Sequence, residues 1–295
     1  MMKCTTKIVI AEGTSIMNIR TSSEKITSIP KELYENRKLI ARLAYNDFKT
    51  KYAGSVFGVF WAFLQPVVTV LVFWFIFEHG LPAAAEQKVS GVEVPFLLFL
   101  VAGFVPWFFF AEALSGGTSA MISYNYLVKK VVFNISILPV VKVTASLFVH
   151  VFFMGFMLFL FMVLGMPIGV HSIQIIYYSA GLYLLVLGTS YITASIVVFF
   201  KDLSAIITIG LQIWMWVTPI MWNLEANIHN PTLLFILKLN PVFYVVSGYR
   251  DAMLGGVWFW ERPLLTLYFW LFTIFVGVLG LRTFAKSKGY FADVL

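Results

Sequence analysis

Six long runs of apolar residues constrain the fold of this chain more than any other feature of its sequence. They occupy residues 55–77, 95–114, 140–164, 173–200, 204–222 and 263–281. A helix of about 20 apolar residues crosses the hydrocarbon core of a bilayer. Of the 295 residues, 60% are hydrophobic and only 12% are charged, which leaves more apolar surface than a water-soluble domain could bury. The sequence therefore predicts an all-α polytopic membrane protein with six transmembrane helices.

The positive charges are unevenly distributed among the segments that connect the runs. Seventeen of the twenty-one Lys and Arg residues lie in residues 1–54, in residues 116–138 with Lys142, in residues 201–202 and in the tail from Arg282. The other four are Lys88, Lys238, Arg250 and Arg262. Because Lys and Arg accumulate in cytoplasmic loops, we predict a multi-pass protein with both termini in the cytoplasm. This asymmetry also accounts for the net charge of +7, so we expect no nucleic-acid partner.

A basic amphipathic segment, residues 33–54, leads directly into the first run. Ile40, Ala44, Phe48 and Tyr52 recur every four residues and share one helix face, and cations fill much of the remainder. We expect this helix to lie in the membrane interface, with its apolar face toward lipid and its cations near phosphate groups. The alternative is an ordinary solvated cytosolic helix. The polar residues 1–32 lack such a period and predict a flexible cytoplasmic extension.

Two connecting segments are irregular. Residues 116–138 begin with a Gly-Gly pair that we expect to break the preceding helix, and they are too polar to cross a membrane, so they predict a short transverse cytoplasmic helix. Residues 223–261 hold two apolar stretches, 232–239 and 244–254, bounded by Asn-Pro and Gly-Gly pairs. Stretches this short do not cross a bilayer, so we predict re-entrant or interfacial helices on the outer side. Residues 285–295 form a short cytoplasmic tail.

Small residues mark one face of the fourth run. Gly181, Gly188 and Ser195 recur at seven-residue spacing, which predicts a seam where another helix approaches closely. The run spans residues 173–200, which at about 1.5 Å per residue is longer than a hydrocarbon core of about 30 Å requires. We therefore expect this helix to tilt or to protrude from the membrane.

The sequence shows no catalytic or nucleotide-binding machinery. It has neither a Gly-x-x-x-x-Gly-Lys phosphate loop nor a dinucleotide-binding glycine fingerprint, and its histidines lack metal-ligand spacing. We therefore predict a chain that is not an enzyme and binds no cofactor. The runs carry almost no charge, which argues against an ion-coupled or proton-coupled transporter. A carrier without a coupling site still needs energy, and the simplest source is a partner protein that hydrolyses nucleotide.

Aromatic residues are abundant, with 30 Phe, 13 Tyr and 9 Trp. Many belong to the belts that aromatic residues form at membrane surfaces. The first run, however, carries them at both ends, and those of interest are Phe57, Phe60, Trp61, Phe73 and Trp74. Aromatic faces provide apolar area on which sugar rings can stack without charge. These five residues are candidates for the wall of a channel that passes a sugar polymer.

Several short motifs resemble those of a known family. The sequence Asn-Asp-Phe-Lys-Thr-Lys-Tyr at residues 46–52, followed by Gly58, Trp61 and Pro66, is similar to the start of ABC-2 type membrane subunits that export bacterial polysaccharides such as O-antigen, capsule and teichoic acid. The family commonly has Arg-Asp-Leu-Lys-x-Arg-Tyr, so Asn and Lys here replace its two Arg residues. Asn-Pro at residues 240–241 with Arg-Asp-Ala at residues 250–252 also resembles the segment before the family's last span.

The resemblance implies a fold of the ABC-2, type V exporter-like class, with residues 55–284 as its six-span domain. Two copies of the chain would form a homodimer with a channel between them. Two copies of a separate cytoplasmic ABC ATPase, which bind ATP and Mg, would supply the energy. The substrate would be a lipid-linked polysaccharide, exported across the bacterial cytoplasmic (inner) membrane, and the surrounding membrane lipids would also contact the protein.

The resemblance also implies roles for particular residues. Arg42, Lys49 and Lys51 become candidates for binding the substrate phosphate or a lipid headgroup, with simple binding of anionic lipid as the alternative. Candidates for coupling to the ATPase are Ser119, Tyr124, Tyr126, Lys129 and Lys130. Candidates for an external gate are Tyr244, Tyr249, Arg250 and Asp251.

Other functions stay open at this point. An ABC-2 exporter of drugs or lipids would have the same architecture. A membrane-embedded glycosyltransferase or ligase acting on lipid-linked sugar would need a carboxylate or Arg that faces a cavity, and Glu112, Arg250 and Asp251 are the residues available. A purely structural scaffold would leave the irregular residues 223–261 unexplained.

Overall fold

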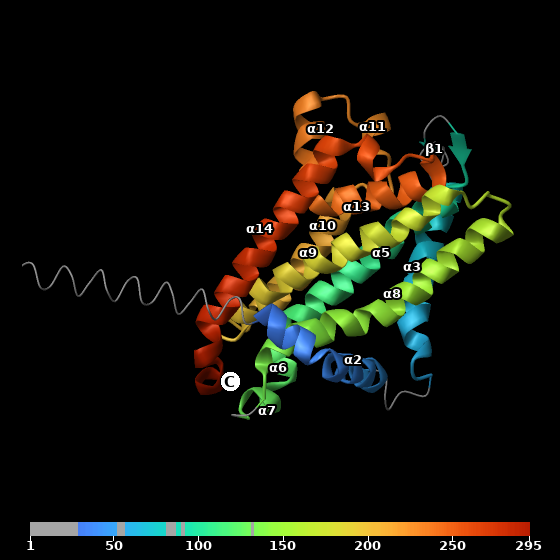
Figure 1. The fold of residues 1–295 in the computed structure, drawn as a ribbon. Coiled ribbons are helices and arrows are strands. Elements are labelled where there is room, and N and C mark those ends of the chain that lie inside the picture. Colours follow the sequence, from blue (N-terminus) through green and yellow to red (C-terminus); the bar gives the residue numbers. More distant parts are fainter. Residues whose placement is uncertain (1–28, 52–56, 81–86, 90–91, 131–132) are drawn as a thin grey trace, which may run out of the picture.

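The fold is a bundle of long helices, seen in a computed structural model that describes residues 29–51, 57–80, 87–89, 92–130 and 133–295 (Figure 1). In the list that follows, α marks α-helices and η marks short 3₁₀ or π helices. The elements are α2 (Arg37–Lys51), α3 (Phe60–Phe75), η1 (Ile76–Gly80), β1 (Gln87–Val89), β2 (Val92–Val94), α5 (Phe96–Thr118), α6 (Ala120–Ser123), α7 (Asn125–Val128), η2 (Ile135–Ile137), α8 (Leu138–Val163), η3 (Val170–Ile173), α9 (Gln174–Val197), α10 (Leu203–Val217), α11 (Leu224–Asn227), α12 (Pro231–Lys238), α13 (Pro241–Arg250), η4 (Asp251–Gly255), η5 (Phe259–Glu261), α14 (Pro263–Ser287), η6 (Lys288–Tyr290) and α15 (Phe291–Val294).

Helix α5 forms the centre of the bundle. It packs against α3, α8, α9, α10 and α13, and most of its side chains are buried. Helices α2, α6 and α7 lie at one end of the bundle together with the C-terminus, and α11, α12 and the β1–β2 hairpin lie at the other (Figure 1). We refer to these as the α2 end and the α12 end. Of the long apolar helices in the described residues, α5 is covered by protein over the largest share of its length, and α9 over the next largest.

Five helices in the described residues are long and apolar enough to cross a membrane, and they correspond to the first, second, third, fourth and sixth predicted runs. The fifth run differs, because α10 ends at Val217 after 15 residues, about 22 Å at 1.5 Å per residue. The residue before a proline is pushed out of the helical region, and Thr218, which precedes Pro219, is extended with ψ 127°. The predicted span over residues 204–222 is therefore too long. Helices α12 and α13, bent by 91° at their junction, are together long and apolar enough to be either a broken sixth span or the re-entrant segment that the sequence predicts.

The β1–β2 hairpin and the C-terminal part of α5 differ from the prediction. The described strands pair in antiparallel fashion, with Gln87 opposite Val94, in a segment for which the all-α prediction expected only a loop. Helix α5 does not break at Gly116-Gly117 but continues to Thr118. Gly117 is needed for a different reason: a side chain there would collide with Ser190 of α9. The glycine permits a close helix contact rather than ending the helix.

Helix α2 uses its apolar face differently from the prediction. Ile40 and Ala44 are buried, and Phe48 packs against Phe148 of α8 with the ring centroids 5.5 Å apart. The face that was predicted to meet lipid is therefore covered largely by α8 and its neighbours. Tyr52, the fourth residue of the predicted face, lies outside the described residues, as do residues 1–28 of the predicted extension.

The small-residue seam of α9 meets α14, as its spacing predicted. A Cβ atom at Gly188 would lie 2.9 Å from the Cα of Gly277, and one at Gly181 would lie 2.8 Å from the ring of Phe269. Ser195, in contrast, is buried and donates to the Tyr191 carbonyl of its own helix at 2.7 Å. Gly188 thus lets the two helix backbones approach closely, and Gly181 makes room for the ring of Phe269.

Two asparagines start the short helices at the α12 end. Asn230 Oδ1 accepts from the backbone N–H of Thr232 at 2.9 Å, and Asn240 Oδ1 accepts from that of Val242 at 3.0 Å. Each asparagine precedes a proline in the first helical position, which is a favoured arrangement because proline lacks an N–H that would need a partner there. Both predicted short helices are therefore present. In α12 no residue is buried, whereas nearly all of α13 is buried.

Candidate functional site

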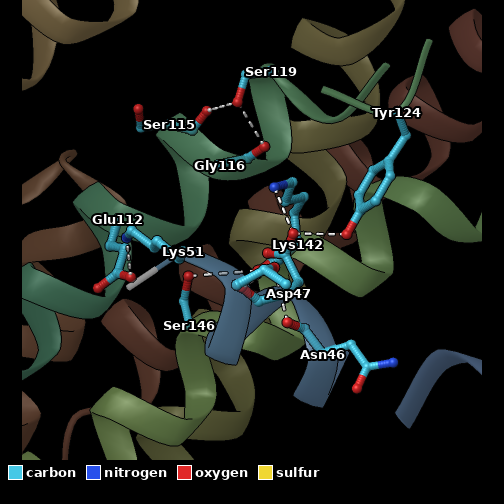
Figure 2. Close-up of polar contacts among 11 residues, drawn as sticks. Asn46, Asp47, Lys51, Glu112, Ser115, Gly116, Ser119, Tyr124, Lys142 and Ser146 are labelled. Atoms are coloured by element: carbon cyan, nitrogen blue, oxygen red, sulfur yellow. Dashed lines mark hydrogen bonds and ion pairs between the residues drawn. The ribbon is translucent and has the colours of Figure 1, made fainter. Parts of the chain in front are cut away.

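A group of charged and polar side chains lies at the α2 end of the bundle (Figure 2). Asp47 of α2 accepts two hydrogen bonds on a single oxygen, Oδ1. Tyr124, at the junction of α6 and α7, donates from its hydroxyl at 2.6 Å, and Lys142, in the second turn of α8, donates from Nζ at 2.7 Å. We call these three residues the Asp47 cluster. It joins three segments that are far apart in the sequence.

The Asp47 cluster is closed and largely shielded from solvent. The side chains of Asp47 and Lys142 are 14% and 18% exposed, and the Lys142 ammonium also lies 5.0 Å from the centre of the Tyr124 ring. Burial, and then the hydrogen bond to Asp47, raise the pKa of the Tyr124 hydroxyl well above its ordinary value. The hydroxyl therefore keeps its proton and stays a donor at any physiological pH.

A second ion pair lies one helical turn further along α2, and in this pair α2 contributes the cation rather than the anion. Lys51 Nζ lies 2.8 Å from Glu112 Oε1 of α5, with side-chain exposures of 50% and 28%. Asp47 and Lys51 are four residues apart and therefore lie on the same face of α2. On that face Asp47 pairs with Lys142 of α8, and Lys51 pairs with Glu112 of α5. Exposed pairs contribute little to stability, about 0–1 kcal/mol, so this second pair holds less firmly than the shielded one.

A cavity of about 400 Å³ is lined by residues of α2, α5 and α8 and lies beside both pairs. Its lining residues are Asp47, Phe48, Lys51, Glu112, Ser115, Gly116, Ser119, Lys142, Ala145 and Ser146. The volume falls within the range of small-molecule pockets, about 300–1,000 Å³. Its cations and carboxylates are already matched, so the cavity carries no strong excess of one charge.

The three predicted phosphate contacts are not brought together. Lys51 belongs to the ion pair with Glu112, whereas Arg42 and Lys49 are exposed on α2. The Lys49 ammonium lies 4.5 Å from the centre of the Tyr45 ring. Their role in binding a phosphate or a lipid headgroup stays a prediction.

The five predicted coupling residues have different surroundings. Tyr124 points inward to Asp47, and the Ser119 hydroxyl donates to the Ser115 and Gly116 carbonyls of α5, each at 3.1 Å (Figure 2). Tyr126, Lys129 and Lys130 are exposed. Only these last three are thus available on the surface for a partner.

Asp47 and Lys142 were not among the predicted site residues, although the sequence contained a signal for them. Lys142 lies near the start of an apolar helix, where a charge needs either water or a partner. Asp47 is the carboxylate four residues before Lys51 on the adjoining basic helix. These two facts indicate that Lys142 needs a carboxylate partner at the α2 end. They do not identify which carboxylate that partner is.

The five aromatic candidates separate into two groups. Phe57, Phe60 and Trp61 are exposed near the start of α3, and the Phe57 and Trp61 rings are in edge contact with centroids 5.7 Å apart. Phe73 instead stacks on Phe104 of α5 at 5.5 Å, and Trp74 is half-buried. The first group remains available to a ligand, and the second mainly packs α3 against the bundle.

The four external-gate candidates are buried inside the chain. Arg250 donates to the Pro219 carbonyl at 2.7 Å and to the Ile220 carbonyl, and its guanidinium lies 3.5 Å from the centre of the Phe99 ring. Asp251 is paired with Arg262 at 2.9 Å. These residues therefore do not form an exposed gate surface in this structure. Arg250 in particular caps the carbonyls left free where α10 ends.

The two tyrosines of α13 hold it against the bundle. Tyr249 lies 2.5 Å from the Ser179 hydroxyl and 3.1 Å from His150 Nε2. Tyr244 lies 3.0 Å from the Thr266 hydroxyl and stacks on Phe269 with centroids 4.7 Å apart. Three polar side chains and one aromatic ring thus contact the tyrosines of α13, and a role of these tyrosines in gating stays a prediction.

Within the described residues, no three His, Cys, Asp or Glu side chains lie close enough together to hold a metal ion. Glu112 is the one enzyme candidate that lines a cavity, and it is paired with Lys51. Arg250 and Asp251, the other two, are buried and engaged with protein groups. The arrangement offers polar contacts and ion pairs rather than an activated nucleophile or base.

The chain is similar to one family model and to several known proteins. A family model described as ABC-2 type transporter matches residues 38–254, a range that contains the Asp47 cluster and α13. An O-antigen export system permease protein, RfbA, from Myxococcus xanthus is 30% identical over 220 residues, which cover 75% of this chain and 82% of that protein. A protein of the same name from Klebsiella pneumoniae is 25% identical over 268 residues, which cover 87% of this chain and 95% of its own length.

Proposed function

We propose that this chain, which belongs to the ABC-2 type transporter family, is the channel subunit of an ATP-driven exporter for a lipid-linked, O-antigen-like polysaccharide. The observation that carries the proposal is the match to two O-antigen export permeases along 75% and 87% of the chain. Five helices long and apolar enough to cross a membrane agree with an integral membrane subunit. The membrane in question is the bacterial cytoplasmic membrane, with both termini on its inner side.

The distribution of charge supports an external source of energy. In the described helices that could cross a membrane, the charged side chains lie near helix ends, as Glu112, Lys142 and Arg282 do. An ion-coupled carrier keeps ionisable groups near the bilayer midplane. The energy would instead come from two copies of a cytoplasmic ABC ATPase, which bind ATP and Mg and dock on the exposed Tyr126, Lys129 and Lys130.

The surface of α3 supports a channel between two copies of the chain. Few residues in the apolar part of α3 are buried within one copy. Phe57, Phe60 and Trp61 would then face the passage and offer stacking area to sugar rings. Arg42, Lys49 and Lys51 would meet the phosphate of the lipid-linked substrate at its cytoplasmic mouth, in competition with anionic lipid.

The test is deletion of the gene in its own cell, followed by complementation with the wild-type gene. Loss of surface polysaccharide with accumulation of lipid-linked polymer inside the cell, both reversed by complementation, supports the proposal. Unchanged surface polymer together with altered drug resistance or lipid distribution would assign the chain to an exporter of drugs or lipids. Loss of polymer synthesis itself, without internal accumulation, would favour a glycosyltransferase or ligase.

A further inference from the structure

We propose that the Asp47 cluster is the joint through which movement of the α6–α7 segment reaches the membrane helices, with Asp47 as the positioning residue. This inference rests on the proposed function, because it concerns how a partner ATPase drives export. The observation behind it is the geometry of one oxygen atom. Asp47 Oδ1 accepts from Tyr124 at 2.6 Å and from Lys142 at 2.7 Å, so three segments meet at a single point.

The joint is stiff because of its bonds and its shielding. Hydrogen bonds that involve an ionised group are shorter and stronger than neutral ones, and both bonds to Asp47 are of this kind. The low exposure of Asp47 and Lys142 limits the access of bulk water to both bonds. Displacement of Tyr124 therefore moves Asp47, and with it the ammonium of Lys142.

Helices α2 and α8 move together because they are also joined by aromatic contacts. The ring of Phe148 on α8 lies 5.5 Å from that of Phe48 and 6.0 Å from that of Tyr45, both on α2. Aromatic contacts of this kind add to the attraction of the ion pair. The cluster therefore passes a displacement to a unit of two helices rather than to a single side chain.

Helix α2 itself is attached to α5 less firmly than to α8. The Lys51–Glu112 pair, which connects α2 to α5, is substantially exposed, so water can take over its interactions. The cavity of about 400 Å³ between the same elements leaves room for a shift without collision. A displacement of Tyr124 therefore reaches the bundle through α8, which packs along α5, rather than through a direct contact of α2 with α5.

The experiment compares Tyr124→Phe, Asp47→Asn and the double variant, each assembled with its ATPase in liposomes loaded with lipid-linked polymer. The measured quantity is polymer exported per ATP hydrolysed, which does not depend on how much complex assembles. We expect each single variant to keep ATP hydrolysis and to lose about tenfold in this yield. The double variant should lose no more than either single one, because both changes break the same joint. Lys142→Arg, which keeps a cationic donor, should retain most of the yield.

Tyr290→Phe and Asp202→Asn are matched controls, since both side chains are exposed and neither belongs to the Asp47 cluster. They should export like the wild type. A wild-type yield per ATP in Tyr124→Phe, or additive losses in the double variant, would overturn the joint while leaving the proposed function intact. Failure of the wild-type complex to export any polymer would overturn the proposed function itself.

Discussion

Replacement of Gly188 by alanine tests whether the contact between α9 and α14 depends on the absence of a side chain. The added Cβ would lie 2.9 Å from both the Cα and the N of Gly277, whereas non-bonded carbon atoms settle at about 3.5–4.0 Å. The colliding atoms belong to the backbone, so no change of rotamer relieves the contact. The two helices must separate by about 0.6 Å, the difference between 2.9 Å and 3.5 Å. Overpacking of this kind costs about 1–3 kcal/mol.

Gly277 on the facing helix provides a matched control. A Cβ there would meet nothing within 4 Å. Alanine is favoured over glycine in a helix by about 0.8–1 kcal/mol, and this gain applies equally to Gly188→Ala and Gly277→Ala. The difference in stability between the two variants therefore isolates the packing cost, and we expect Gly188→Ala to be less stable by about 1–3 kcal/mol.

The assay is thermal unfolding in a mild detergent, followed by tryptophan fluorescence at one heating rate for all variants. Gly280→Ala should resemble Gly188→Ala, because its Cβ would collide with the Gly188 carbonyl. Equal unfolding midpoints for Gly188→Ala and Gly277→Ala would refute the reasoning, because the packing cost predicted at Gly188 would then be absent.

Three further outcomes are expected. Arg250→Met should lower the unfolding midpoint, because each buried carbonyl that loses its donor at the end of α10 costs about 1–3 kcal/mol; a midpoint equal to that of the wild type would contradict this anchoring role. Combined Lys129→Glu and Lys130→Glu should reduce recovery of the ATPase in a pull-down from detergent, and full recovery would mean that the partner docks elsewhere. Trp61→Ala should lower the amount of surface polysaccharide at equal protein level, with Phe275→Ala on the exposed face of α14 as control; equal export by both would return Trp61 to a packing or lipid-facing role.

The helices that the sequence predicted well are those whose signals are local. Long apolar runs indicated the spanning helices, and the Asn-Pro pairs indicated the starts of α12 and α13, because an asparagine side chain and a proline ring act within one turn. The Gly116-Gly117 pair misled for the opposite reason. Its purpose is set by Ser190, a residue far away in the sequence, and no local rule distinguishes a glycine that ends a helix from one that admits a neighbouring helix.

The candidate site was harder to predict than the fold because its partners are distant or are not side chains. Asp47 and Lys142 are 95 residues apart, and their meeting depends on how α2 packs against α8. Arg250 was predicted as a gate residue, and in the structure it binds the main-chain carbonyls of Pro219 and Ile220, which no pattern of side chains indicates. The four gate candidates are buried, three of them in α13 and Asp251 directly after it, and their role in gating stays a prediction.

The central position of α5 has a consequence for how the chain is made. A helix surrounded by protein could in principle carry polar groups satisfied by its neighbours, yet Phe96–Ala111 contains no charged residue. During synthesis α5 emerges before α8, α9 and α13, so lipid must cover it until those helices arrive. Its uniform apolarity is thus a requirement of membrane insertion, and only the later helices turn a lipid-facing surface into a packed interior.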